Sequence, residues 1–203
     1  MRRTKEDAAK TRAAIVDAAL ACFDRHGIAG STLDHIAEAA KCTKGAIYHY
    51  FDTKESLLLG VIEHHQALAF GRVEDVLHDK TLAPSSRIQL VVQRIFSGGT
   101  PRGRRLLALL VRGIAHEVPE VHARWIEEGP ARLWTIVAEL VNEGKRSGEF
   151  RADADGEVAS RLLVSGLMLQ LMWRQHGDII PAVDIDETRL VDSGVELFLA
   201  ALR

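Results

Sequence analysis

Two helix-start signals lie close together in residues 31–51, which read S-T-L-D-H-I-A-E-A-A-K-C-T-K-G-A-I-Y-H-Y-F. Thr32 precedes apolar residues spaced at i, i+3, i+4 and i+7, so its hydroxyl is placed to cap a helix that begins at Leu33. Thr43 is placed to cap a second short helix that ends near Phe51. Two short helices joined by a tight turn form a helix-turn-helix, whose second helix lies in the major groove of DNA.

The composition of the 203-residue chain favours a mainly helical protein. Hydrophobic residues make up 47% of the chain but aromatic residues only 5%, which suits Ala-, Leu- and Val-rich helices better than a β-sandwich. The pattern predicts nine helices, and therefore an all-α fold, with one helix kinked at Gly129 and Pro130. The expected helices cover residues 5–26, 33–40, 45–51, 54–78, 84–97, 106–116, 119–147, 154–176 and 187–202.

Charge is distributed unevenly along the chain. The net charge is −2, so the total charge gives no sign of nucleic-acid binding. Residues 1–12, however, hold five basic and two acidic side chains, whereas residues 53–203 hold 18 basic and 21 acidic ones. A basic N-terminal unit on an acidic body is expected for a small DNA-binding footprint beside a separate sensing domain, although a solvated N-terminal tail would give a similar pattern.

The cysteines and the apolar stretches indicate the cellular compartment of the protein. Cys22 lies on the apolar stripe of the first expected helix and Cys42 in the helix-turn-helix turn; we expect both to be small apolar side chains, with a thiol sensor at Cys42 as the alternative. Two cysteines without a spaced framework fit a reducing compartment. The longest apolar stretch, residues 162–173, is interrupted and shorter than the ~20 residues of a membrane span. Because the N-terminus also lacks an apolar signal segment, we expect a soluble cytoplasmic protein with no membrane partner.

The stretch T-L-D-H-I-A-E-A-A-K-C-T-K-G-A-I-Y-H-Y-F-D-T-K-E-S-L, residues 32–57, resembles the DNA-binding signature of the TetR family of bacterial transcriptional regulators. Residues 10–27 resemble the first helix of that family, and the opening R-R-T-K-E-D-A-A-K-T-R is most similar to the branch with the AcrR-type regulators of multidrug efflux operons. At Lys41 the family usually has Gly, and if the turn requires a positive φ there, a residue with a β-carbon costs about 1 kcal/mol.

The resemblance implies a nine-helix protein in two domains. Residues 1–52 would form the three-helix DNA-binding domain, and residues 53–203 a larger helical domain for effector binding and dimerisation. In this family the last two helices pair with those of a second copy to form a four-helix bundle. The residues that the resemblance assigns to DNA contacts are Thr32, Thr43, Lys44, Gly45, Tyr48, His49 and Lys54. The threonines, Tyr48 and Lys54 would contact phosphates, Lys44 and His49 bases or phosphates, and Gly45 would allow close approach to the major groove.

Two further sets of residues follow from the same resemblance. The candidates for contact with a small-molecule effector are aromatic, His or Met side chains, each of which is equally suited to a plain core position: His65, Phe70, Trp125, Trp134 and Met168. The candidates for the dimer interface lie on the last two helices, where glycines would let backbones approach closely: Leu162, Gly166, Leu169, Gly194 and Phe198.

We therefore expect a homodimeric repressor that binds a pseudo-palindromic operator and is released by a small, largely apolar ligand. The rival interpretation is an all-α enzyme or metal-binding protein that uses His116, Glu120 and His122. Their spacing does not match H-E-x-x-H, and no nucleophile elbow or dinucleotide fingerprint is found, so we expect no catalytic residues, no metal site and no cofactor. A ligand-independent or activating regulator remains an alternative within the DNA-binding class.

Overall fold

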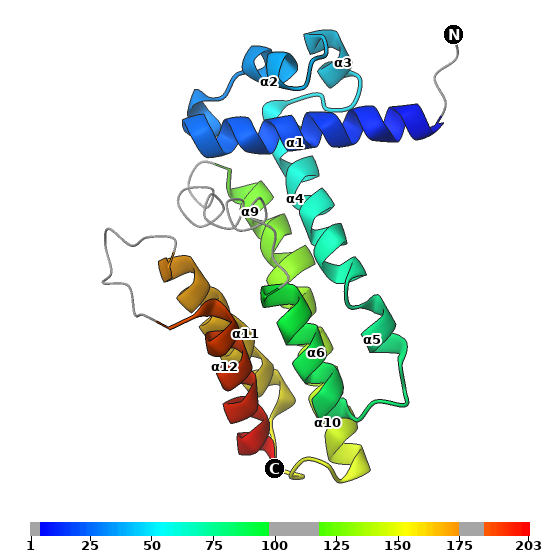
Figure 1. The fold of residues 1–203 in the computed structure, drawn as a ribbon, viewed down its shortest axis with the longest axis vertical. Coiled ribbons are helices and arrows are strands. Elements are labelled where there is room, and N and C mark those ends of the chain that lie inside the picture. The colour runs from blue at the N-terminus through cyan, green and yellow to red at the C-terminus, as the bar shows by residue number, and fades with distance from the viewer. Residues whose placement is uncertain (1–4, 98–117, 175–184) are drawn as a thin grey trace. The chain divides into compact units, whose positions relative to one another are not determined.

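The structure is a computed structural model that describes residues 5–97, 118–174 and 185–203, and every element in these ranges is a helix (Figure 1). The all-α prediction is therefore confirmed. The chain forms two compact units, one of residues Met1–His65 with Pro101–Trp125 and the other of Gln66–Thr100 with Ile126–Arg203. The helix expected over residues 106–116 lies outside the described residues. None of the described helices is long and apolar enough to span a membrane.

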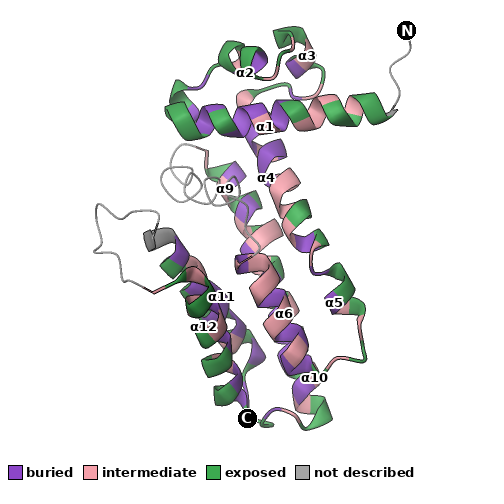
Figure 2. Ribbon diagram, viewed as in Figure 1, coloured by how far each residue is buried: buried purple, intermediate pink, exposed green. Residues whose placement is uncertain are grey.

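Three N-terminal helices, called the reader below, belong to the first unit: α1 (Lys5–Gly30), α2 (Leu33–Ala39) and α3 (Lys44–Tyr48). The expected break after residue 26 occurs at Gly27, whose φ of 69° interrupts α1 before a last helical turn to Gly30. The apolar stripe expected on the first helix, with Ile15, either Ala18 or Ala19, Cys22 and Phe23, is confirmed, because these residues are buried, including both alanines. Figure 2 shows buried positions recurring along α1.

The helix predicted over residues 54–78 is wrong in its length. The structure has α4 (Lys54–Gly71), a short turn and then α5 (Glu74–His78). Val73 lies in the turn and is fully buried, as is nearly all of Val76 in α5. The break after Gly71 places both valines in the core, whereas Leu68 of α4 is 53% exposed.

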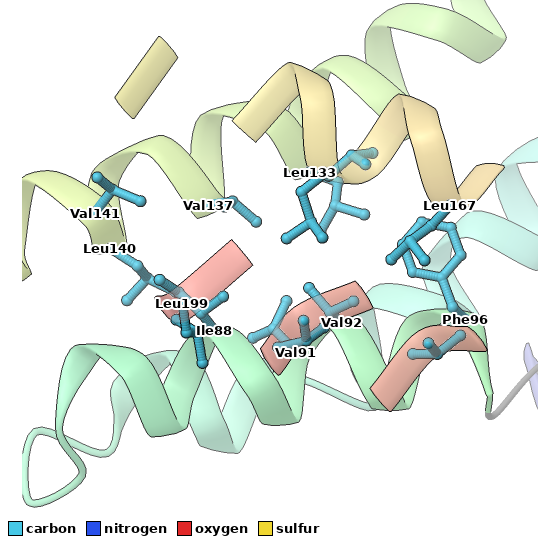
Figure 3. Packing of buried hydrophobic residues seen from close by; sticks show 14 of the residues in the cluster. Ile88, Val91, Val92, Phe96, Leu133, Val137, Leu140, Val141, Leu167 and Leu199 are labelled. Atoms are coloured by element: carbon cyan, nitrogen blue, oxygen red, sulfur yellow. The ribbon is translucent and has the colours of Figure 1, made fainter. Parts of the chain in front are cut away.

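Four long helices of the second unit surround one apolar core: α6 (Pro84–Phe96), α10 (Arg132–Ser147), α11 (Gly156–Arg174) and α12 (Glu187–Leu202). Together with α5 they are called the body below. Side chains of α6 and α10 face one another at its centre, with Leu167 of α11 and Leu199 of α12 closing the core (Figure 3). Pro84 lies in the first turn of α6, and Gly148 ends α10 at a left-handed φ of 78°.

The expected kink at Gly129 and Pro130 takes the form of a π-helical turn. The helix α9 (Pro119–Ile126) passes into η2 (Glu127–Ala131) and then into α10. Proline has no N–H for the regular helical hydrogen bond, so the backbone is free to adopt a wider turn here. The end of the Gln66 side chain lies directly against Gly129, so a β-carbon there would require that side chain to move.

Candidate nucleic-acid interface

The two short helices of the reader are capped as the sequence predicts. Thr32 has extended backbone geometry, and its Oγ1 accepts a hydrogen bond from the backbone N–H of His35 at 3.2 Å. Thr43 repeats the arrangement, its Oγ1 accepting from the N–H of Ala46 at 3.1 Å. Both hydroxyls are exposed beside the free N–H groups of a helix start, where oxygen anions such as DNA phosphates are favoured.

The turn between α2 and α3 has a positive φ at Lys41, which is the condition on which the expected strain depended. Lys41 has a φ of 53° and is the only non-glycine residue with a positive φ among the described residues. Its N–H donates to Glu38 O at 3.1 Å, and the Cys42 N–H donates to Ala37 O at 3.0 Å. This pair of bonds is the Schellman motif, which normally has glycine at the position that Lys41 occupies. The half-buried Cys42 follows it in the turn.

One face of α3 is polar and open, and the other anchors the helix. Ile47 is fully buried and the nearby Phe51 is 5% exposed, so these two side chains hold α3 in the reader. The residues of α3 and its C-cap that were predicted to contact DNA are all exposed: Lys44, Gly45, Tyr48 and His49. A β-carbon on Gly45 would meet no protein atom closer than 3.9 Å, so that side of the helix start is open.

An acidic residue that no sequence motif indicated lies beside this face. The Asp34 carboxylate accepts a hydrogen bond from Lys44 Nζ at 2.9 Å, and both side chains are exposed. The hydrogen bond, helped by charge attraction, raises the pKa of Lys44. The opposite charges ten positions apart, across the helix-turn-helix turn, were the available signal. The pair holds the ammonium group of Lys44 beside the N-terminus of α3.

Lys54 is placed differently from the other predicted DNA-contacting residues. Its ammonium group donates to the backbone carbonyl oxygens of Ile28 at 2.8 Å, Ser31 at 3.4 Å and Ala29 at 3.5 Å. These carbonyls lie at the corner between α1 and α2. The expected contact of Lys54 with the DNA backbone stays a prediction, and it competes with these bonds within the protein.

The five effector candidates do not belong to one part of the fold. Phe70 is part of the core of the second unit, and Trp134 and Met168 pack against that core. The Phe70 and Trp134 rings are each covered by an arginine, Arg132 at 4.2 Å and Arg161 at 5.5 Å from the ring centres. The half-buried His65 and the buried Trp125 fall in the first unit. Contact of any of the five with an effector stays a prediction.

Four of the five dimer candidates line one open apolar groove between α11 and α12, namely Leu162, Gly166, Gly194 and Phe198. Leu162 is 72% exposed, and Leu169, one turn beyond Gly166 on α11, is 40% exposed. A β-carbon on Gly166 would meet no atom within 4 Å, whereas one on Gly194 would lie 3.1 Å from Leu167 of the same chain. The glycine at 194 thus serves the packing of α11 on α12 within one copy.

The residues of the rival metal or enzyme interpretation are only partly described. His116 lies outside the described residues, Glu120 is exposed in the first turn of α9, and the His122 ring lies 5.4 Å from the Trp125 ring. Over the ranges that the structure covers, no three His, Cys, Asp or Glu side chains gather at metal-ligand distances.

Comparison with known proteins agrees with the geometry of the reader. Residues 15–61 match the family described as bacterial regulatory proteins, tetR family, and residues 88–203 match the AefR-like transcriptional repressor C-terminal domain. The transcriptional regulator TtgR of Pseudomonas putida is 46% identical over 97% of this chain and 95% of its own. The repressor KstR2 of Rhodococcus jostii is 23% identical over 82% and 80% of the two chains.

Among solved structures, the complex of SmeT with triclosan superposes with a TM-score of 0.77 at 26% identity, covering 95% of this chain and 91% of that one. SmeT is the repressor of the Stenotrophomonas maltophilia multidrug efflux pump SmeDEF. Three observations indicate the same family. They are the capped helix-turn-helix with its open polar face, the matching C-terminal domain, and a relative that aligns over nearly the full length of the chain. The chain belongs to the TetR family of bacterial transcriptional regulators, whose members bind DNA.

Proposed function

We propose that the protein is a homodimeric repressor that binds a pseudo-palindromic operator through its two readers and acts in the cytoplasm. The open face of α3, anchored by Ile47 and Phe51, is the observation that carries this proposal. Lys44 and His49 contact base edges or phosphates, Gly45 allows close approach to the groove, and Tyr48, 48% exposed, reaches a phosphate through its hydroxyl. The capping residues Thr32 and Thr43 bind phosphates at the helix starts.

Dimerisation places the two reading helices in successive major grooves. The groove between α11 and α12 supports this step, since Leu162 and Leu197 at its rim are 72% and 73% exposed. Apolar side chains exposed to that degree are stabilised when a second copy covers them. The twofold axis then sets the separation of the half-sites to about 34–36 Å, one turn of DNA. Residues 1–52 would act as the DNA-binding domain and residues 53–203 as the effector-binding and dimerisation domain.

A small, largely apolar effector releases the operator in this proposal. The ligand named for SmeT, triclosan, is of that kind. Release requires that the effector bind one arrangement of the protein better than the other, because a ligand with equal affinity for both shifts nothing. Titration of triclosan and related apolar compounds into the operator complex tests this step. An operator affinity that no such compound changes would refute the ligand-responsive part of the proposal.

Fluorescence anisotropy on the DNA upstream of the coding region, with a scrambled duplex as competitor, tests operator binding. We expect competitor-resistant binding by the wild type and its loss in the double variant Lys44→Ala/Tyr48→Ala. Arg146→Ala is the matched control, because it removes an exposed basic residue from the end of α10 in the body. Equal, weak binding of the wild type to both duplexes would contradict the proposal.

Light scattering tests the dimer. The wild type should have twice the 22.4 kDa mass of the chain, whereas Leu162→Glu/Leu197→Glu should be monomeric and bind the operator weakly. Leu68→Glu is the control, since Leu68 is also exposed but does not line the groove. A dimer that survives the double substitution would place the interface elsewhere.

A further inference from the structure

The side chain of Lys54, the first residue of α4, ends at the corner where the chain turns from α1 into α2. Its Nζ lies 2.8 Å from the carbonyl oxygen of Ile28, with the carbonyls of Ser31 and Ala29 at 3.4 and 3.5 Å. Carbonyl groups at a helix C-terminus lack partners within the helix, and a cation there is favoured by hydrogen bonding and by the helix dipole. An ammonium group has three N–H donors, so these carbonyls can engage all of them.

The corner that Lys54 reaches determines the direction of α2. Gly27, with φ 69° and ψ 173°, breaks the helix, and the Ser31 hydroxyl then donates to Gly27 O at 2.7 Å. Ser31 is 2% exposed, which is unusual for serine and shows that the corner is tightly closed. Because Thr32 caps α2 directly after Ser31, any movement of the corner changes the direction of α2, and with it that of α3 beyond the Schellman turn.

The other end of the Lys54 side chain is also held firmly. The residue before it, Thr53, accepts from the Ser56 N–H through its hydroxyl at 3.0 Å, and the Thr53 N–H donates to the Ser56 hydroxyl at 3.0 Å. This reciprocal pair has the form of a capping box and fixes the first turn of α4. Further along α4, a β-carbon on Gly60 would overlap the Phe51 ring, so α4 also lies close against the chain that follows α3.

We propose that Lys54 is a positioning residue for DNA recognition: it fastens the start of α4 to the α1–α2 corner and so sets the orientation of the reading helix. This inference rests on the proposed function. The role differs from that of a phosphate ligand, since an ammonium group that binds three carbonyls must leave them to reach DNA. Lys54 therefore contributes to sequence discrimination without adding to the charge that the protein places against the phosphates.

The two roles predict different responses to salt and to sequence. Loss of a phosphate contact weakens binding about equally on every DNA sequence and lowers the salt slope by about 1. Loss of a positioning contact instead misorients α3, so it weakens binding to the operator but leaves binding to scrambled DNA and its salt dependence unchanged. A general loss of stability changes neither the sequence discrimination nor the salt slope of the fraction of protein that remains folded.

The experiment measures anisotropy on operator and scrambled duplexes at several salt concentrations. Lys54→Met keeps the apolar length of the side chain and removes its donors. We expect about a tenfold loss of operator affinity, with unchanged affinity and salt slope on scrambled DNA. Lys54→Arg retains donors for the carbonyls and should recover most of the discrimination. Equal losses on both duplexes with a slope lowered by about 1 would overturn the inference in favour of a phosphate contact.

A second variant changes a buried residue of the same α1–α2 corner. Ser31→Ala removes the bond to Gly27 O, and because Ser31 is buried, its hydroxyl cannot act on DNA directly. We expect the same loss of discrimination as in Lys54→Met, and this variant also serves if Lys54→Met does not fold. Wild-type discrimination in both variants would overturn the inference while leaving the proposed function intact. Failure of the wild type itself to distinguish the two duplexes would instead refute the proposed function.

Discussion

In the reader, α2 and α3 contain seven and five residues, whereas the body helices α6, α10, α11 and α12 contain 13 to 19. Isolated helices shorter than ~12–15 residues are marginal in water, so α2 and α3 depend on caps, a tight turn and a few buried side chains. The body helices depend on a shared apolar core instead (Figures 2 and 3). Local backbone geometry thus defines the reader, and tertiary packing defines the body.

The ion pairs of the two regions differ in the same way. Lys44 and Asp34 in the reader are both exposed, so the pair contributes little to stability and leaves Lys44 accessible to DNA. In the body, the Arg87 side chain is 3% exposed and bridges three segments of the chain. It binds both carboxylate oxygens of Glu143 in α10 at 2.9 Å and donates to the carbonyls of Val76 and Leu77 in α5.

The largest effect is expected from removing this buried cation. Arg87→Leu removes the buried donor of two α5 carbonyls and two of the hydrogen bonds to Glu143, which keeps its bond to Lys80. We expect the free energy of unfolding to fall by about 3 kcal/mol. Urea denaturation followed by circular dichroism measures the change. Lys80→Ala is the control, because Lys80 binds the same carboxylate at 3.2 Å but is 67% exposed. Equal destabilisation by the two variants would show that burial of the cation does not decide how strongly it stabilises the body.

The same pair should make the stability of the body depend on acid. Hydrogen bonds from Arg87, and secondarily from Lys80, hold the pKa of Glu143 below its ordinary value of 4.5. The folded protein therefore binds fewer protons than the unfolded chain between the two pKa values, and stability falls as the pH is lowered through that window. Unfolding measured from pH 7 downwards should show a smaller loss of stability below pH ~4.5 in Glu143→Gln than in the wild type. Parallel pH profiles would contradict this role of the ion pair.

Gly27 in the reader and Gly148 in the body allow the effect of a Gly→Ala substitution on stability to be compared between the two regions. At Gly27 and Gly148 an added β-carbon meets no atom within 4 Å, so the cost of Ala is conformational. The backbone of Gly27 at φ 69° and ψ 173° is almost restricted to glycine, and we expect Gly27→Ala to cost about 2 kcal/mol. Gly148 has the ordinary left-handed conformation, so Gly148→Ala should cost about 1 kcal/mol. Circular dichroism measures both values.

The functional consequences of the two glycine variants should also differ. Gly27 starts the corner that directs α2, so Gly27→Ala should weaken operator binding in the anisotropy assay. Gly148 ends a body helix, and Gly148→Ala should leave operator affinity unchanged in the folded protein. If both variants weakened operator binding equally, the geometry of the reader would not be set by its own backbone.

The features that the sequence predicted correctly are those that a few neighbouring residues determine. Thr32 and Thr43 cap the helices that follow them, the first helix is interrupted after residue 26, and the last helix covers residues 187–202 as expected. Each of these depends on hydrogen bonds or backbone preferences within about four residues. The helical periodicity likewise identified the buried stripe of α1, because burial there follows one face of a single helix.

The features that the sequence did not predict depend on contacts between distant residues. The break between α4 and α5 depends on the core that receives Val73 and Val76. Arg87 on α6 gave no sign of burial, because its partner Glu143 is 56 residues away. In the candidate site, the position of Lys54 beside three carbonyls follows from the fold of the α1–α2 corner, which lies 23 to 26 residues earlier. Effector and dimer contacts involve a second molecule and are not encoded in local spacing.

The smallest effect is expected at Lys41, where the reader has a strained backbone that its local sequence does not favour. A non-glycine residue at φ 53° costs about 1 kcal/mol of backbone strain, which glycine would relieve. Glycine also has greater freedom in the unfolded chain, and this offsets part of the stabilisation. We therefore expect Lys41→Gly to raise the free energy of unfolding by about 0.5 kcal/mol. Lys41→Ala is the control, because it removes the same charge and keeps the β-carbon. Equal stabilisation by the two variants would assign the effect to the lysine side chain, and the turn of the reader would then not be strained by its backbone.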